Sequence, residues 1–397
     1  MSEHKKKINF GVIGTGARSG SLIRTLTQDK EKRGDIIALC DTRTNALEKY
    51  ENIIKNNLGH GCKKYYDYLE LLRDPEVDAV VISTPDYLHY NMAVEAFNLK
   101  KHVFLEKPVG INLDQMIDIL RAAKRSGKIL EVGYVLRYSP FFIEIKKMID
   151  QGIIGRPMFV QAIEEYYGAY HFNRGWWRKK ANTGGIMIQK ICHDMDLFYW
   201  MFGKPKRVAA FASINEFKPG NWNSDAKFCH ECKNRCPYYS TPQGRTYSDE
   251  CVYNSDHDVE DNAQVIIEFE NGVNLSMGMV FFNSLAQDDR HWKVIGNKGE
   301  ISGRLSEQII RFDPRHDHTL KKSILYECAA TSLGGHGGGD EVQMIEFLNA
   351  LSEGREAKAG LESAYWSSIL VMGAQISADI GKVILIDDLV KKYPFPH

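Results

Sequence analysis

The sequence predicts two domains of different fold class: a doubly wound α/β domain, and an α+β domain with a large, open, mostly antiparallel sheet. Three observations support this prediction. Short apolar runs alternate with amphipathic segments up to residue 134, and longer strand-like runs dominate the region after it. The length, 397 residues, is sufficient for two hydrophobic cores. We therefore expect domains at residues 1–134 and 135–397.

Continuous apolar runs in the first region predict parallel strands, because a strand covered by helices on both faces needs no polar alternation. These runs are Ile8–Ile13, Ile36–Cys40, Ala79–Ile82, His102–Leu105 and Ile129–Val132. The amphipathic segments between them predict helices, which gives a doubly wound sheet. The segment Asn112–Arg125 also carries helix-end signals, with Asn112 as N-cap, Gln115 three residues on and Gly127 just past the end.

The second region predicts an open sheet with helices on one face. Its strand signals are Met158–Ala162, Arg207–Phe217, Gln264–Phe269, Val273–Phe282, Trp292–Ile295 and Ile309–Phe312. Its helix signals are Phe142–Ile149, Gly185–Phe202, Glu341–Leu351 and Glu362–Ile380. We expect the last two helices to return to the first domain. Asn271–Gly272 predicts a hairpin, because both residues tolerate positive φ.

The charge balance argues against polyanionic partners. The chain holds 51 basic and 51 acidic residues, so no large net field attracts it to nucleic acid or to an anionic membrane. No apolar stretch reaches the roughly 20 residues of a spanning helix, and no apolar signal segment opens the chain. We therefore expect a cytoplasmic protein with neither nucleic acid nor a membrane as partner.

A glycine-rich turn, Gly14-Thr15-Gly16, joins the first predicted strand to a helix that begins near Arg18. Such a turn lets a backbone and a helix N-terminus approach the pyrophosphate of a dinucleotide. The third glycine, Gly20, comes one position late, and Ser19 stands at the usual spacing. Taken alone, the motif also fits a simple tight strand–helix turn.

Asp41, at the end of the second predicted strand, strengthens the dinucleotide interpretation. Its carboxylate can accept both ribose hydroxyls of NAD and would repel the 2′-phosphate of NADP. Arg43, two residues later, could reverse that preference by pairing with the phosphate. We therefore expect NAD as the cofactor, with NADP as the less favoured alternative.

Other candidate cofactor contacts follow the later parallel strands, where doubly wound sheets bind their ligands. Ser83-Thr84-Pro85-Asp86 ends one strand, with His89 one turn into the next helix, although Thr84 and Asp86 also suit capping roles. Glu106-Lys107-Pro108 closes another strand and delivers an ammonium group to the same edge. The full set is Gly14, Thr15, Gly16, Ala17, Arg18, Asp41, Thr42, Arg43, Ser83, Thr84, Pro85, Asp86, His89, Glu106 and Lys107.

These motifs resemble those of the glucose–fructose oxidoreductase and inositol dehydrogenase (Gfo/Idh/MocA) family, over nearly the full length. The resemblance rests on the glycine turn, Thr84-Pro85-Asp86 with His89, Glu106-Lys107-Pro108, Gly133-Tyr134 with Arg137, Trp177-Arg178, and Gly184-Gly185 leading to His193 and Asp196. It implies an NAD(P)-binding Rossmann domain, action on a secondary alcohol of a sugar or cyclitol, and a homodimer or homotetramer formed through the C-terminal sheet. It also implies that Lys107 hydrogen-bonds the reacting oxygen and that His193 is the general acid/base.

The chemistry of His193 fits that role, because removing a hydroxyl proton needs a base that titrates near neutrality. A satisfied core histidine is the alternative, since the surrounding helix is apolar. Inositol-type members often carry Asp four residues earlier; Gln189 stands there, followed by Lys190. Glutamine can bind a sugar hydroxyl but cannot take a proton. The substrate-contact set is Gln189, Lys190, Tyr134, Trp177, Arg178 and His336.

His336 lies in a glycine-rich run that ends at Asp340. The run precedes a predicted helix, for which Asp340 is the expected N-cap and Gln343 occupies the capping-box position. One interpretation is a flexible helix entry. The other, favoured by the family resemblance, is that His336 reaches the active cleft.

Four cysteines, Cys229, Cys232, Cys236 and Cys251, gather in one polar stretch. In the cytoplasm thiols stay reduced, so clustered cysteines suggest a metal before a disulfide. Four thiolates can enclose Zn²⁺ tetrahedrally and stabilise a long loop. We therefore predict a structural zinc, with His230 as a substitute ligand. Unliganded thiols or a stress disulfide are the alternatives, and an iron–sulfur cluster is less expected.

The sequence thus predicts an NAD-dependent oxidoreductase that acts on a secondary alcohol of a sugar, glycoside or polyol. Two alternatives stay open. One is glycoside cleavage by transient oxidation and elimination, with NAD regenerated in each turnover. The other is a non-catalytic protein that senses a nucleotide.

Overall fold

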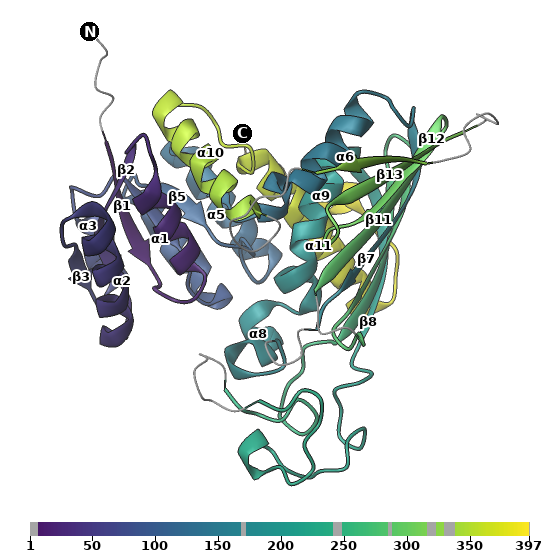
Figure 1. Ribbon diagram of the computed structural model, residues 1–397, viewed down its shortest axis with the longest axis horizontal. Coiled ribbons are helices and arrows are strands. Elements are labelled where there is room, and N and C mark those ends of the chain that lie inside the picture. The colour runs from purple at the N-terminus through teal and green to yellow at the C-terminus, as the bar shows by residue number, and fades with distance from the viewer. Residues whose placement is uncertain are drawn as a thin grey trace. The chain divides into compact units, whose positions relative to one another are not determined.

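The computed structural model of the protein describes residues 7–167, 172–240, 248–284, 288–315, 323–328 and 338–396 (Figure 1). The chain forms two compact units. The first comprises Met1–Pro140, Ala330–Ser368 and Tyr393–His397, and the second comprises Phe141–Ala329 and Ile369–Lys392. The division falls inside the long helix α11 (Leu361–Ile380), so one helix carries the chain from the first unit to the second.

The first unit contains a six-stranded parallel sheet in the order β3-β2-β1-β4-β5-β6. Its strands are β1 (Ile8–Ile13), β2 (Gly34–Cys40), β3 (Lys63–Tyr65), β4 (Ala79–Ile82), β5 (His102–Leu105) and β6 (Leu130–Val132). This strand order is that of the doubly wound dinucleotide-binding fold, so the predicted fold class is confirmed. The sequence did not predict β3, which is short, polar and largely exposed.

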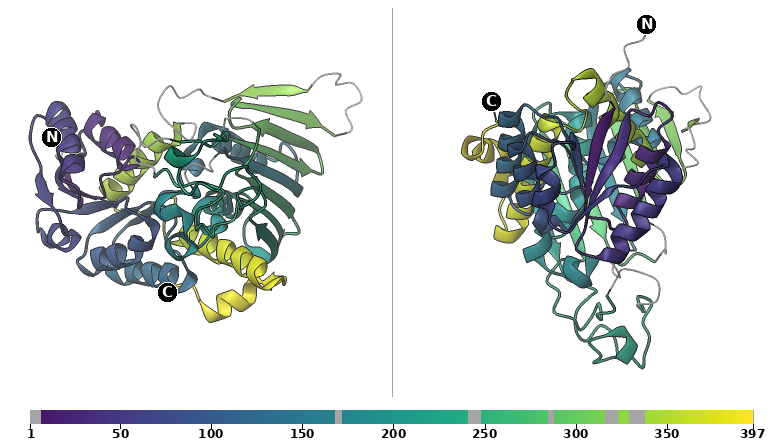
Figure 2. Two further views of the ribbon diagram at one scale, coloured as in Figure 1. Left: turned by 90° about the horizontal axis from the view of Figure 1, so that it is seen from below. Right: turned by 90° about the vertical axis from the view of Figure 1, so that its left-hand side faces the viewer.

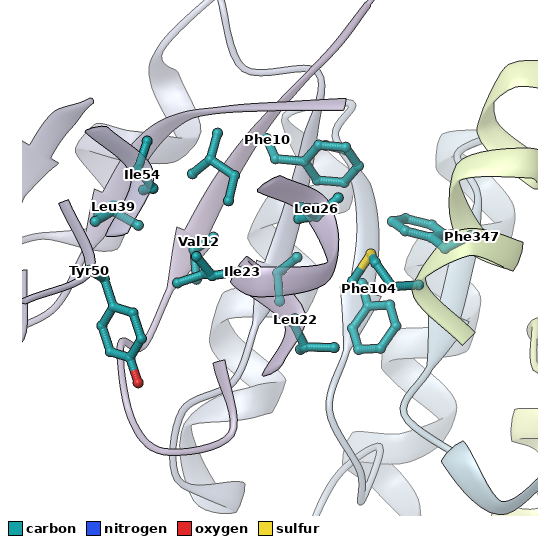
Figure 3. Close-up of a cluster of buried hydrophobic side chains, with 14 of the residues drawn as sticks. Phe10, Val12, Leu22, Ile23, Leu26, Leu39, Tyr50, Ile54, Phe104 and Phe347 are labelled. Carbon is teal, nitrogen blue, oxygen red and sulfur yellow. The ribbon is translucent and has the colours of Figure 1, made fainter. Parts of the chain in front are cut away.

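Helices cover both faces of this sheet, as the right-hand view of Figure 2 shows. They are α1 (Ser19–Gln28), α2 (Thr44–Leu58), α3 (Tyr68–Arg73), α4 (His89–Asn98), α5 (Leu113–Ser126) and α10 (Gly339–Glu353). Apolar side chains of β1, α1 and α2 form a buried cluster (Figure 3), which Phe347 of α10 completes. The Phe347 ring lies 6.2 Å from that of Phe10 and 5.8 Å from that of Phe104. Helix α10 therefore belongs to the core of the first unit, although it is distant in sequence.

The ends of two helices test the capping predictions. In α5, Asn112 Oδ1 accepts a hydrogen bond from Gln115 N at 3.0 Å and Gly127 adopts a φ of 69°, so both end signals are confirmed. In α10 the capping prediction is wrong. The N-cap is Gly338, Asp340 lies inside the first turn, and Gln343 bonds instead to Glu131 and to the Val132 carbonyl.

The second unit is built on a nine-stranded sheet in the order β14-β13-β12-β11-β7-β10-β9-β8-β15. Its strands are β7 (Pro157–Glu165), β8 (Pro205–Ser213), β9 (Asn262–Phe269), β10 (Asn274–Val280), β11 (Asp289–Gly296), β12 (Gly299–Arg304), β13 (Ile309–Pro314), β14 (Ile324–Glu327) and β15 (Ile384–Leu385). Among the strand pairs that the structure describes in this sheet, only β7–β10 is parallel, which confirms a mostly antiparallel sheet. The predicted hairpin joins β9 to β10, but only Gly272 has a positive φ, 86°.

Helices lie on one face of this sheet (Figure 1). They include α6 (Pro140–Asp150), α9 (Cys192–Phe202) and the later part of α11, while α8 (Lys180–Thr183) and α12 (Ile386–Lys392) are shorter. Trp292 of β11 packs against Phe142 and Phe198, with ring centroids 5.1 Å apart in both pairs. The opposite face leaves Phe159, Phe211 and Ile266 at 41%, 72% and 60% exposure. Among the described helices, none has the length and apolar character needed to cross a bilayer.

Candidate active site

The carboxyl ends of neighbouring parallel strands bring the candidate cofactor residues of the first unit into one row. Strands β2, β1, β4, β5 and β6 end in register, since Cys40, Ile13, Ile82, Leu105 and Val132 pair in sequence across the sheet. The chain order reverses between β1 and β4, and doubly wound sheets bind ligands at such a switch point. The residues that follow the five strand ends are Asp41, Gly14, Ser83, Glu106 and Gly133.

The glycine turn has different requirements at each glycine. Gly14 has a φ of 88°, and a Cβ there would lie 2.6 Å from the Ser83 carbonyl oxygen. A Cβ on Gly20 would lie 2.8 Å from the Tyr50 hydroxyl, which donates to Gly16 O at 2.7 Å. A Cβ on Gly16 would meet nothing within 4 Å. The protein's own packing therefore needs Gly14 and Gly20, whereas Gly16 borders open space.

Asp41 is held ionised beside this turn. Its Oδ2 accepts hydrogen bonds from Thr15 N and Thr15 Oγ1, both at 2.8 Å, and its Oδ1 accepts from Arg43 Nε at 3.0 Å. Burial opposes ionisation, but the hydrogen bonds from Arg43 and Thr15 outweigh it and lower the Asp41 pKa to about 2. The carboxylate therefore stays ionised at the end of β2, with exposed Thr42 and Arg43 next to it in the chain.

The end of β4 is tied to the Glu106-Lys107-Pro108 segment. His89 is fully buried, and its ring nitrogens face the carbonyl oxygens of Thr84 at 3.1 Å and of Pro108 at 2.7 Å. Burial lowers the pKa of His89. Ser83 Oγ donates to Gly14 O at 3.1 Å. Pro85 and buried Asp86 begin a short 3₁₀ turn. In this structure His89 holds two strand ends together.

Glu106 and Arg18 form an ion pair across the row. Arg18 Nε donates to Glu106 Oε1 at 2.5 Å, and Arg18 Nη1 also donates to Asp340 Oδ1. A Cβ on Gly133 would lie 2.8 Å from Glu106 Oε2, so this glycine leaves room for the carboxylate. Lys107, which follows Glu106, is partly buried. The contact with Asp340 was not predicted, because nothing in the local sequence links the two residues.

The candidate residues of the second unit lie on a distorted helix. Gly185 has a φ of 106°, and Glu260 Oε2 accepts a hydrogen bond from Ile186 N at 3.2 Å. A π-helical turn, Met187–Ile191, then precedes α9. Such turns occur often at functional sites. The turn carries Gln189 and Lys190, and α9 carries His193; all three are buried.

Lys190 takes part in a buried cluster of charges. Its ammonium group lies 3.1 Å from Glu164 Oε1 and 3.8 Å from the centre of the Tyr166 ring. Arg290 pairs with the same Glu164 oxygen at 2.5 Å and with Asp194 Oδ1 at 3.1 Å. Burial raises the pKa of Asp194, against the opposing effect of Arg290. The cluster joins the segment that carries His193 to strands β7 and β11.

Sequence reasoning missed Glu164 and Arg290, although a signal was present. The buried positions of β7 alternate as Val160, Ala162 and Glu164, so the strand period places a carboxylate on the inner face. Arg290 is directly opposite Glu164 in the sheet. A charged residue in phase with the apolar face of a strand predicts a buried ion pair.

The remaining substrate candidates lie in separate surroundings. The rings of Trp176 and Trp177 are 4.5 Å apart, and Arg178 Nε donates to Asp256 Oδ1 at 2.7 Å. Tyr134 of the first unit is buried. His336 lies outside the described residues. No described contact tests the roles predicted for these residues, which stay predictions.

The predicted zinc site at Cys229, Cys232, Cys236 and Cys251 is not supported. All four are free cysteines, and the described residues hold no group of three or more Cys, His, Asp or Glu side chains arranged for a metal. Cys229 Sγ accepts a hydrogen bond from the buried Arg174 guanidinium at 3.2 Å, and Cys232 Sγ donates to Asn234 O at 3.1 Å. The segment instead packs on its own aromatic rings, including Phe217, whose ring lies 4.9 Å from that of Tyr238.

Comparison with known proteins identifies the family. Residues 8–134 match the oxidoreductase family with an NAD-binding Rossmann fold, and residues 142–302 match the GFO/IDH/MocA C-terminal domain. The chain therefore belongs to the Gfo/Idh/MocA family of oxidoreductases, as its motifs predicted.

Individual relatives agree with this assignment. YteT of Bacillus subtilis, an oxidoreductase by name, is 30% identical over 319 residues, 70% of this chain and 74% of that protein. An inositol 2-dehydrogenase/D-chiro-inositol 3-dehydrogenase of Lactiplantibacillus plantarum is 28% identical over 210 residues, 53% of this chain and 55% of that enzyme. The solved structure of a levoglucosan dehydrogenase with NADH and levoglucosan has the same fold, with a TM-score of 0.77 at 17% identity over 96% of this chain and 100% of that one.

Proposed function

We propose that the protein is an NAD-dependent dehydrogenase that acts on a secondary alcohol of a sugar, glycoside or polyol. The observation that carries the proposal is the row of Gly14, Asp41 and Glu106 at one edge of the parallel sheet, directly followed by Lys107. The inositol and levoglucosan dehydrogenases among the similar proteins support the substrate class.

The proposed residues divide the chemistry between them. A bound nicotinamide would supply the acceptor, or in reverse the donor, of the hydride exchanged with the carbinol carbon. Gly14, Gly16 and the first turn of α1 would hold the pyrophosphate, and Asp41 the ribose. Lys107 would donate a hydrogen bond to the reacting oxygen, and His193 would accept the hydroxyl proton as the carbonyl forms. In the reverse direction His193 returns that proton to the oxygen.

The proposed preference for NAD rests on Asp41. Its low pKa keeps a negative charge at the position where the 2′-phosphate of a bound NADP would lie. Arg43 partly neutralises that charge but is itself engaged, with Nη2 3.1 Å from Asp41 Oδ2. We expect tighter binding of NADH than of NADPH, and Asp41→Ser should narrow the difference. Equal affinities in the native protein would contradict the proposal.

Active-site variants test the roles of Lys107 and His193. His193→Asn is expected to lower kcat by about 10²–10⁴-fold, the usual contribution of a positioned proton-transfer group. Lys107→Met is expected to lower it by about 10²–10³-fold, the usual contribution of a hydrogen-bond donor to the reacting oxygen. NADH binding should change little in both variants. Lys124→Met and His60→Asn, on the surface of the first unit, are matched controls. Retention of full turnover by either active-site variant would refute the assigned role.

The stoichiometry of the reaction separates the proposed activity from its rivals. The native protein is incubated with NAD and a panel of polyols, sugars and glycosides, and NADH and free sugar are both measured. Accumulation of NADH with a ketone product supports a dehydrogenase. Release of sugar without net NADH would indicate redox-neutral glycoside cleavage, and NADH binding without any turnover would indicate a nucleotide sensor.

We further propose that the protein self-associates through the open face of the nine-stranded sheet, as a homodimer or homotetramer. Phe159, Phe211 and Ile266, exposed on strands β7, β8 and β9 of the sheet, support this, because apolar side chains gathered on one exposed face are typical of interaction surfaces. Ile266→Lys is expected to shift the mass measured by light scattering toward the monomer. A native protein that is monomeric at high concentration would refute the proposal.

A further inference from the structure

Buried ion pairs attach the segment around His193 to two neighbouring strands of the nine-stranded sheet. Glu164 of β7 and Arg290 of β11 are directly opposite each other, and Arg290 Nη2 lies 2.5 Å from Glu164 Oε1. The same carboxylate oxygen lies 3.1 Å from the Lys190 ammonium group. Arg290 also donates to Asp194, from Nε to Oδ1 at 3.1 Å and from Nη2 to Oδ2 at 3.3 Å. Lys190 and Asp194 lie on either side of His193 in the chain, so the segment is attached at two points.

These attachments are rigid because solvent hardly reaches them. The side-chain exposures are 1% for Glu164, 7% for Arg290 and 0% for Asp194. A guanidinium that meets a carboxylate with two N–H groups fixes both the distance and the orientation of the pair. A displacement of Asp194 from Arg290 would therefore cost more free energy than the displacement of a pair at the surface.

The attached segment contains a rare backbone feature, the π-helical turn Met187–Ile191. It directly precedes α9, whose second residue is His193. A π-helical turn holds one residue more than the α-helical turn that it replaces. Each residue of an α-helix advances the side-chain direction by roughly 100°, so a return of this turn to α-helix would aim the imidazole elsewhere. Lys190 lies inside the turn and Asp194 follows it, so both ion pairs act on the element that sets the direction of His193.

We propose that Arg290 and Glu164 are positioning residues for His193. Through Lys190 and Asp194 they hold the π-helical turn against the sheet, and the turn in its place sets the direction of the imidazole. The inference rests on the proposed function, since it takes His193 as the proton-transfer group. It gives a role in the reaction to residues that lie outside every motif from which the site was predicted.

Two variants loosen the attachment without removing its polar character. Arg290→Lys keeps the cation but loses the fork, and Asp194→Asn keeps the shape of the side chain but loses its charge. Each is made alone and in combination with His193→Asn.

Arg304→Lys is the matched control. Arg304 of β12 links the same two strands, with Nη1 3.3 Å from Glu165 Oε2 and 3.1 Å from Asp289 Oδ2. These carboxylates are adjacent in the chain to Glu164 and Arg290. They belong to the other face of the sheet, because successive side chains of a strand alternate between its faces.

The first measurement is amide hydrogen exchange, followed by mass spectrometry, which needs no substrate. We expect Arg290→Lys and Asp194→Asn to exchange roughly tenfold faster than the native protein in residues 187–194, because the segment opens more often when its attachments weaken. Arg304→Lys should change the exchange of these residues by less than about twofold.

The second measurement is turnover of the compound that the native protein oxidises fastest in the panel of polyols, sugars and glycosides. Arg290→Lys should lower kcat roughly 10–100-fold, because a small misplacement of a catalytic group is costly, while KM and the Kd of NADH change by less than about threefold. In the His193→Asn background the same substitution should lower kcat by less than about twofold, since residues that act as a unit are not additive. A merely structural role would lower kcat by a similar factor in both backgrounds.

Four results would overturn the inference while the proposed function stands: native exchange in Arg290→Lys, native kcat in that variant, an undiminished loss of kcat in the His193→Asn background, or equal effects in Arg304→Lys. If Arg290→Lys does not fold, Asp194→Asn decides by the same criteria. A native protein that binds NADH but oxidises no compound of the panel would overturn the proposed function and the catalytic part of the inference. The exchange rates alone would then decide whether the ion pairs hold the turn.

Discussion

Glu131 on β6 provides a quantitative test of the structure through the pH dependence of stability. Its carboxyl is fully buried, and its Oε1 accepts hydrogen bonds from Tyr138 at 2.8 Å and Gln343 at 2.7 Å. Among the described residues, Oε2 has no hydrogen-bond partner. Burial raises the Glu131 pKa from 4.5 to about 7, although both hydrogen bonds favour the ionised form. A proton on Oε2 therefore suits the folded state.

The sign and size of the effect follow from linkage. Between the unfolded pKa near 4.5 and the folded pKa near 7, the folded protein binds more protons than the unfolded chain. The free energy of unfolding therefore falls as pH rises through this window and levels off above it. At ~1.36 kcal/mol per pKa unit, Glu131 accounts for a loss of about 3 kcal/mol.

Glu131→Gln should remove this dependence, because glutamine resembles the protonated carboxyl and does not ionise. We expect urea unfolding, followed by circular dichroism from about pH 5 to about pH 8, to show the variant gaining up to about 3 kcal/mol over the native protein as pH rises. Glu70→Gln, an exposed carboxylate of the same unit, is the control and should follow the native profile. Parallel profiles for the native protein and Glu131→Gln would refute the reasoning.

Three further predictions concern the glycine turn, the buried charges and the cysteines. Gly16→Ala should fold normally but bind NADH more weakly, whereas Gly14→Ala should destabilise the protein by about 1–3 kcal/mol, since its Cβ would lie 2.6 Å from a carbonyl oxygen. Thermal melts and NADH titrations of both variants check this. A destabilised Gly16→Ala together with a stable Gly14→Ala would contradict it. Arg290→Met should lower the free energy of unfolding by about 3–5 kcal/mol, because it removes the ion-pair partner of buried Asp194 and leaves buried Glu164 with Lys190 alone. A loss below about 1 kcal/mol in urea unfolding would speak against the cluster. A chelator should leave the melting temperature unchanged, and elemental analysis should find no stoichiometric zinc, since the described cysteines form no metal site. One zinc per chain would show that the cysteines do bind a metal.

The parts of the fold that sequence predicted well are those in which local pattern and tertiary environment agree. The strands Ala79–Ile82 and His102–Leu105 were predicted to the residue, because a strand covered on both faces is a continuous apolar run. The strand Lys63–Tyr65 has no such run, and its pairing with β2 alone defines it. The α5 ends were equally local, since Asn112 caps its own helix.

In the candidate site too, the features that sequence could predict are those set by local pattern. The strand ends that carry Gly14, Asp41 and Glu106 are local features, and register brings them into one row. Asp340 shows where local reasoning fails. The residue type and spacing satisfy a capping box, but Asp340 pairs with Arg18, 322 residues away. The predicted zinc site is likewise not supported, and cysteine spacing alone does not reveal that buried Arg174 donates to Cys229.

Buried charge accompanies both candidate catalytic residues, and stability alone is a poor explanation for it. A buried ion cluster can often be replaced by apolar side chains of similar volume without loss of stability. Yet Arg18 pairs with Glu106, the residue before Lys107, and Arg290 pairs with Asp194, the residue after His193. In each case a carboxylate adjacent in sequence to a proposed catalytic group is tied to an element far away in the chain. Such ion pairs specify one side-chain geometry where apolar packing would tolerate several. A catalytic group requires one fixed geometry, because it must meet a reacting atom.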